Sequence, residues 1–242
     1  MSPLRVAAAA LLLPAALSPA LAQEPAYLAG DRFIYERIER DSAGLETKRL
    51  EVVWEVLEST TTGHRIRIVE DPAGAAKETV WIFDRDHNVL AQEAGACRNA
   101  SEPNAGRYRW PMSNDSAWSA VYDVVQHCPG ESPKRQGRCE VQAKVVWQGT
   151  YDALQAPAPA IAIERVVTCV GPTGSALDGA AVRWEKELLC PTLGVRCAYE
   201  YDWVVFGPGQ ATPTVLSAFR DLPEAQTWGG RVGETLQGLE LR

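Results

Sequence analysis

Apolar and polar residues alternate with a period of two along several stretches of this chain. The alternation is clear over residues 50–57, 139–148 and 197–205. Successive side chains of a β-strand point to opposite faces of its sheet, so the pattern predicts strands with one buried face. It is typical of antiparallel sheets, because buried parallel strands usually read as continuous apolar runs.

Short clusters of Gly, Pro, Asp, Asn and Ser separate these stretches, as expected for turns. Residues 116–126 are rich in aromatic and β-branched residues, which favours a strand over a helix. Residues 145–169 read as a hairpin that returns at Ala156–Pro159, with Val145 and Trp147 on one face. We therefore expect an all-β fold, an antiparallel curved sheet or half-barrel.

The order of strand-like segments is similar in two parts of the chain, residues 28–93 and 107–222. This similarity suggests two related meander halves, although any meander can give the same order. The polar segment 94–111 is the expected linker between them. The length suits a single β domain over residues 23–222, followed by a C-terminal tail at 223–242.

The N-terminus has the features of a signal peptide. Arg5 precedes an apolar run at 6–17, and Ala20-Leu21-Ala22 matches an A-x-A cleavage site. We expect a signal peptide at 1–22, cleavage after Ala22, and a periplasmic or secreted protein. No later stretch is long and apolar enough for a membrane helix, so we expect a protein that is not integral to the membrane.

Cysteine usage agrees with export. The six cysteines are Cys97, Cys128, Cys139, Cys169, Cys190 and Cys197. An even number in an exported chain indicates disulfides, and the C-x-x-C pairs typical of zinc sites are missing from the sequence. Cys190 and Cys197 flank a short turn and Cys128 and Cys139 flank a polar loop, so we expect these two pairs. That assignment leaves Cys97 to pair with Cys169.

The charge of the chain argues against some partners. The formal net charge is -7 and the sequence holds no basic run, so we expect no nucleic-acid partner. We also expect no cofactor and no metal. The oligomeric state cannot be predicted from these features.

Several short motifs resemble those of a group of exported bacterial β-proteins of unknown function. Gly30-Asp31-Arg32-Phe33-Ile34-Tyr35 is similar to their G-D-x-aromatic-x-Tyr opening, and the segment 156–161 is similar to their V-P-A-G-T-F turn. Pro159 stands in place of the turn glycine. The resemblance implies a fold related to the LolA/LolB-like half-barrels, whose concave face holds lipid.

Motifs for catalysis are weak. His64, His87 and His127 are scattered and lack the context of a catalytic triad. The segment Asp84–Asn88 has the spacing of a calcium loop at its start, but the later glycine and glutamate positions of that loop do not match, so we expect a hairpin turn.

Two pairs of carboxylates could also carry acid–base chemistry. Glu185 with Glu187, and Glu200 with Asp202, have the i, i+2 spacing that places both side chains on one face of a strand. Such a pair could serve a glycosidase, whereas we interpret both pairs as part of a solvated face because they alternate with apolar residues.

Aromatic residues on the expected strands are the candidates for ligand binding. They are either ordinary core or the lining of an open concave face that accepts an apolar or sugar-like ligand. The candidates are Trp54, Trp147, Trp184, Tyr199, Tyr201 and Trp203.

The function that fits these features best is a non-catalytic periplasmic binding or carrier module for an apolar or envelope-derived ligand. The alternatives are a cell-envelope structural or interaction protein without a small ligand, and a hydrolase whose site is not visible in the sequence. An open cavity would favour the carrier, and a filled core with an exposed edge strand would favour the interaction protein. A buried His–carboxylate pair beside a Ser would favour the hydrolase.

Overall fold

The alternating stretches form β-strands in the computed structural model, which describes residues 27–41, 43–153, 156–173, 179–193, 195–208 and 228–241. The expected signal peptide, 1–22, lies outside these residues. The strands are β1 (Arg32–Arg40), β2 (Glu46–Thr60), β3 (Gly63–Glu70), β4 (Lys77–Asp84), β5 (Val89–Ala94), β6 (Cys97–Glu102), β7 (Ala117–His127), β8 (Lys134–Ala153), β9 (Ala156–Val170), β10 (Ala180–Cys190), β11 (Val195–Phe206) and β12 (Trp228–Glu240).

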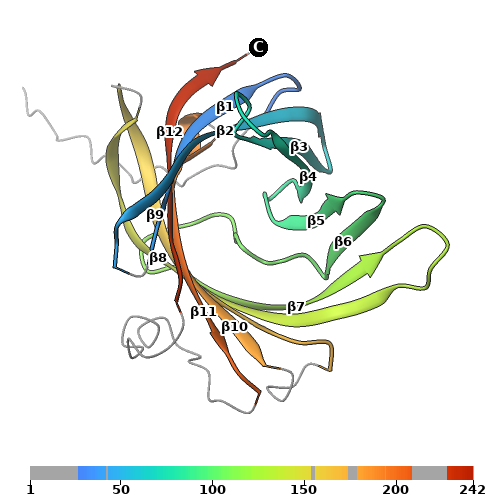
Figure 1. The fold of residues 1–242 in the computed structure, drawn as a ribbon. Helices are drawn as coiled ribbons and strands as arrows, with labels where there is room; N and C mark the ends of the chain where they lie inside the picture. The colour runs from blue at the N-terminus through green and yellow to red at the C-terminus, as the bar shows by residue number, and fades with distance from the viewer. Residues whose placement is uncertain are drawn as a thin grey trace, which may run out of the picture.

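Each strand pairs antiparallel with the next along the chain, and β12 pairs with β1 to close a barrel (Figure 1). The prediction of an all-β, antiparallel fold is confirmed, including a strand at 116–126, which is β7. The curved sheet closes on itself completely. Strands from both of the expected halves belong to this one sheet.

The strand that closes the barrel comes from the expected C-terminal tail. β12 pairs with β11 on one side and with β1 on the other. Val232 and Leu236 of β12 are buried. The β domain therefore extends beyond residue 222, because β12 forms the hydrogen-bonded pairings that join β11 to β1.

The expected hairpin at 145–169 is formed by β8 and β9, with two differences in detail. A bulge lies between Val145 and Trp147, so Val145 is buried whereas Trp147 is 43% exposed. One extra residue in a strand turns the following side chains to the other face. The segment Ala156–Pro159, expected to be the turn, belongs to β9 and extends past the β9–β10 pairing, where proline costs no hydrogen bond.

The expected linker at 94–111 contributes β6 and part of a segment, 103–116, that crosses the inside of the barrel (Figure 1). Hydrogen bonds fix this segment at several points. The Trp118 indole N–H donates to the Gly106 carbonyl at 2.9 Å, and the Tyr108 N–H donates to Asn88 Oδ1 at 2.7 Å. Met112 is buried in the core between the segment and strands β7 to β9. The segment therefore links opposite walls of the barrel.

All six cysteines form disulfides, as predicted. The Cys190–Cys197 pair is the expected one. The other two expected pairs are wrong, because the structure has Cys97–Cys128 and Cys139–Cys169. The physical reason is strand register: Cys139 and Cys169 are directly opposite on β8 and β9, and the Cys97–Cys128 bond bridges β6 and the end of β7.

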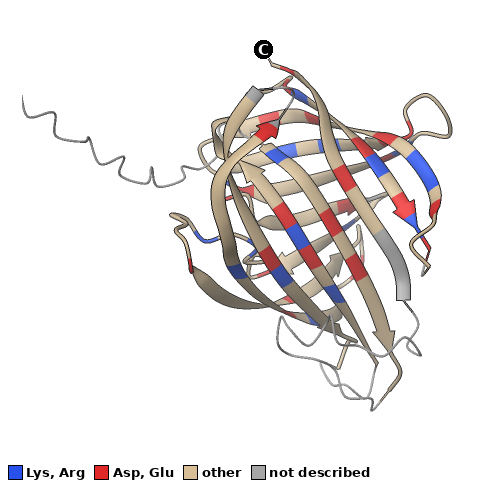
Figure 2. Ribbon diagram, turned by 90° about the vertical axis from the view of Figure 1, so that its left-hand side faces the viewer, with Lys and Arg blue, Asp and Glu red and all other residues tan. Residues whose placement is uncertain are grey.

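Acidic and basic residues are interspersed along the strands of the barrel, as Figure 2 shows for one side. Many of them form cross-strand ion pairs, such as Arg67 with Glu55 at 2.5 Å. Among the described residues, no helix has the length and apolar character needed to cross a membrane.

Candidate functional site

A cavity of about 260 Å³ lies inside the barrel. Its lining comes from β1 to β5, from β10 to β12, and from the crossing segment. Aromatic and aliphatic side chains of β2 to β4 form one wall, including Trp54, Ile68 and Trp81. The opposite wall is rich in arginine and glutamate. The cavity is therefore amphipathic.

One group of charged residues connects β1, β3, β11 and β12. Glu234 pairs with Arg37 at 2.6 Å and also with Arg196, while Arg37 reaches Glu70 at 2.7 Å. All four residues line the cavity. Their formal charges cancel, since two arginines face two glutamates.

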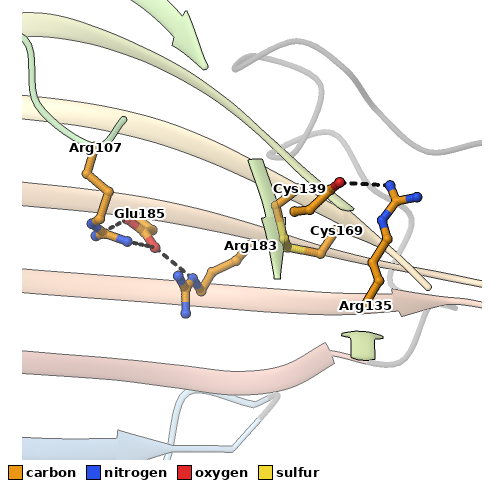
Figure 3. Close-up of a disulfide and its surroundings, with 7 residues drawn as sticks. Arg107, Arg135, Cys139, Cys169, Arg183 and Glu185 are labelled. Carbon is orange, nitrogen blue, oxygen red and sulfur yellow. Dashed lines mark hydrogen bonds and ion pairs between the residues drawn. A yellow bond between two sulfur atoms is a disulfide. The ribbon is translucent and has the colours of Figure 1, made fainter. Parts of the chain in front are cut away.

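A second group lies between the crossing segment and strands β9 and β10 (Figure 3). Glu185 contacts Arg107 at 2.5 Å, Arg183 at 2.6 Å and Arg165 at 3.3 Å. Arg165 also pairs with Glu187 at 2.6 Å. Glu185 is 0% exposed, so these charges are removed from water and depend on one another.

The interpretation of Glu185 and Glu187 as a solvated face is wrong, because both side chains are buried in the charged interior. Burial alone would raise the pKa of Glu185, but the guanidinium groups of Arg107 and Arg183 outweigh it and hold that pKa well below the ordinary value. The pKa of Glu187 is also lowered, mainly by Arg165 against the effect of burial. Both residues are carboxylates at neutral pH, and this leaves no proton for a general acid.

The tyrosines of the interior stay neutral. Burial raises the pKa of Tyr199 to about 12, and the Glu185 carboxylate adds to that effect. Burial likewise raises the pKa of Tyr108, whose hydroxyl donates a hydrogen bond to Glu187 at 2.7 Å. The neutral Tyr108 hydroxyl therefore acts as a donor to the Glu187 carboxylate.

Arg196 is surrounded by aromatic rings. Its guanidinium carbon lies 4.2 Å from the ring centre of Tyr199 and 4.6 Å from that of Trp54. Such contacts stabilise a cation in a site with little water. The buried indole N–H of Trp54 has no hydrogen-bond partner among the described residues, which leaves one donor at the cavity wall.

Three of the six aromatic candidates from the sequence line this cavity, namely Trp54, Tyr199 and Tyr201. Trp203 instead lines a second cavity, of about 330 Å³, formed by β7, β9, β10 and β11. Tyr201 and Arg183 line both cavities. The two spaces therefore share one wall.

The other two candidates lie away from the cavities. Trp147 is turned to the exposed side of β8 by the bulge described above. Trp184 is buried in an apolar cluster with Val182 and Val204, on the face of β10 opposite to Arg183 and Glu185. Neither side chain is in a position to contact a ligand in the barrel.

Little in the described part of the chain favours catalysis. The Ser59 hydroxyl lies 3.0 Å from Nδ1 of the buried His64, but neither residue lines either cavity. The His64 ring instead stacks on His87, and both rings contact Tyr27. No group of three or more metal-binding side chains occurs in the described ranges.

Comparison with known proteins finds structural similarity at low identity. No family model and no curated protein matches the sequence. An exported protein with a YmcC-like fold from Bacteroides fragilis is 11% identical, with a TM-score of 0.44, and the match covers 90% of this chain and 98% of that protein. The hypothetical lipoprotein YmcC of Escherichia coli is 8% identical, with a TM-score of 0.43, and the match covers 87% of this chain and 85% of YmcC.

Proposed function

We propose that this chain is an exported, non-catalytic binding protein that holds a small ligand inside its barrel. The observation that carries the proposal is the amphipathic cavity of about 260 Å³, lined by aromatic side chains on one wall and by charged side chains on the other. Small-molecule sites are concave, largely apolar and supplied with a few placed polar groups, and this space has each property. Its volume suits a small ligand or one part of a larger ligand.

Two features support a binding protein over an interaction protein without a ligand. Among the described strands each has a neighbour on both sides, so the closed barrel has no edge strand that could pair along its whole length with another chain. The interior also retains open space and an unpaired indole donor at Trp54, where a purely structural barrel would be filled.

The proposed location is the periplasm or the extracellular space, after removal of residues 1–22. Disulfides are typical of oxidising compartments, and the structure contains three of them. The ligand would then come from the cell envelope or from outside the cell.

Native mass spectrometry of the full chain, exported by its own leader and purified without refolding, tests the proposal. We expect an added mass that disappears on denaturation. Thr79→Trp places an indole in the cavity, whereas Glu78→Trp adds the same group on the outer face of β4. We expect the added mass to be lost in the first variant and kept in the second.

Two results would contradict the proposal. One is a wild-type mass equal to that of the polypeptide alone under every purification condition. The other is an added mass that Thr79→Trp leaves unchanged while the circular dichroism spectrum shows a folded barrel.

A further inference from the structure

Taken together, the two charged groups described above carry more positive than negative charge. The first group, built on Glu234, has two arginines and two glutamates. The second group has three arginines, Arg107, Arg165 and Arg183, against the two glutamates Glu185 and Glu187. The lowered pKa values of both glutamates keep them ionised, so one positive charge remains without a counter-charge within this group.

The surplus charge is best placed at Arg183. Its side chain is 39% exposed, whereas those of Arg107 and Arg165 are 14% and 0% exposed. Glu185 is its ion-pair partner in the described part of the chain, through Nε at 2.6 Å (Figure 3). That contact uses one side of the guanidinium, and an arginine presents its remaining N–H groups as a planar fork suited to an anion.

Arg183 also lies where the two cavities meet, since it lines both of them. A row of aromatic rings on β11 runs along the same boundary. The ring centres of Tyr199 and Tyr201 are 5.3 Å apart, and those of Tyr201 and Trp203 are 5.6 Å apart. Tyr199 lines the first cavity and Trp203 the second, so the row passes from one space to the other.

These rings are tilted by 40° and 34° to one another and lie beside a cation, and this combination favours a particular ligand. Flat apolar surfaces stack on aromatic rings at small entropic cost, because the rings are already held in place by their neighbours. A neutral ligand would leave the second group with one more positive than negative charge in a partly dry site, which is unfavourable.

We propose that the ligand of this barrel is an organic anion with a flat apolar body, and that Arg183 binds its anionic group at the junction of the two cavities. The body of the ligand lies along the rings of Tyr199, Tyr201 and Trp203. This inference rests on the proposed function and adds the chemical class of the ligand.

A pair of fluorescent probes tests the inference on the full exported chain. Anilinonaphthalene sulfonate and phenylnaphthylamine share the same aromatic body, and the first carries an added sulfonate. We expect the sulfonate to bind at least about tenfold more tightly, the effect of one charge-assisted hydrogen bond. Fluorescence titration of both probes gives this ratio for the wild-type protein without any variant.

Substitutions of Arg183 then test whether this residue causes the preference for the sulfonate probe. Arg183→Gln should reduce sulfonate affinity about tenfold and leave the affinity for the neutral probe unchanged. Arg183→Lys keeps the charge and should retain part of the preference. Arg65→Gln is the matched control, because Arg65 pairs with Glu93 on the outer face of the barrel, and it should change neither affinity.

Equal affinities of the two probes for the wild-type protein would overturn the inference and leave the proposed binding function intact. A preference for sulfonate that survives Arg183→Gln in a folded protein would overturn the role of Arg183. Binding of neither probe would overturn the inference as well, and the native mass measurement decides the proposed function separately.

Discussion

Replacing Glu185 by glutamine removes the buried carboxylate that holds three arginines together. Its oxygens lie 2.5 Å from Arg107, 2.6 Å from Arg183 and 3.3 Å from Arg165. The glutamine amide keeps the shape of the side chain but brings an N–H₂ group against guanidinium N–H donors. Breaking a buried ion pair on one side costs about 3–5 kcal/mol, because the remaining charge stays out of water. We expect Glu185→Gln to lower the free energy of unfolding by about that amount.

A surface ion pair of similar length provides the control. Arg32 and Glu240 lie 2.5 Å apart across β1 and β12, but their side chains are 41% and 55% exposed. Exposed pairs contribute at most about 1 kcal/mol, so Glu240→Gln should cost little. Urea unfolding followed by tryptophan fluorescence, with disulfides intact, measures both costs. If Glu185→Gln costs no more than Glu240→Gln, the account of the interior charges is wrong.

The same substitution predicts a pH dependence. The pKa of Glu185 is lowered in the folded protein, so the native state binds fewer protons than the unfolded state below the ordinary glutamate pKa of about 4.3. Its stabilising contribution is therefore complete above that pH and is lost as the pH falls toward the lowered pKa. The difference in unfolding free energy between wild type and Glu185→Gln should be constant from pH 8 to about pH 5 and shrink in stronger acid. A difference that grows in acid would contradict this sign.

Three further outcomes follow from the fold. Gly106→Ala should destabilise the protein by about 1–3 kcal/mol, since the new Cβ would lie 2.2 Å from a β7 side chain. Gly95→Ala, at a similar φ but in open space, should cost less. Equal urea midpoints for the two variants would contradict this. Replacing Cys139 and Cys169 together by alanine should cost about 4 kcal/mol, because their bond closes a loop with a sequence separation of 30; a cost under about 1 kcal/mol in the same assay would refute it. N-terminal sequencing of the exported protein should begin at Gln23, and an intact first residue would rule out the proposed cleavage.

Strand content could be predicted from the sequence because alternation records burial on one face. The pairing of the strands also determines which cysteines face one another. The expected pairs are instead based on which cysteines lie close together in the sequence. The pairing of Ala153 with Ala156 would place Cys139 opposite residue 170, and the bulge between Val145 and Trp147 moves its partner by one residue to Cys169. Closure of the barrel could not be predicted in this way, because the pairing of β12 with β1 joins segments about two hundred residues apart.

The site was harder to predict because its charged residues occupy positions that normally hold apolar side chains. Arg165 interrupts the inward stripe of Ile163 and Val167 on β9, and this break was the available signal. Glu185 and Glu187 look like ordinary surface residues until the crossing segment brings Arg107 against Glu185 and Tyr108 against Glu187. A contact between residues far apart in the chain produces no periodic pattern in the sequence.

A crystal structure of the exported protein, purified without refolding, tests most directly whether the cavity is a ligand site. We expect electron density for a bound molecule inside the barrel, bounded by Trp81 and Arg196, with its anionic group within hydrogen-bonding distance of Arg183. A barrel in which Trp54 and Tyr199 move together and fill the space, with no room left for a ligand, would contradict the account.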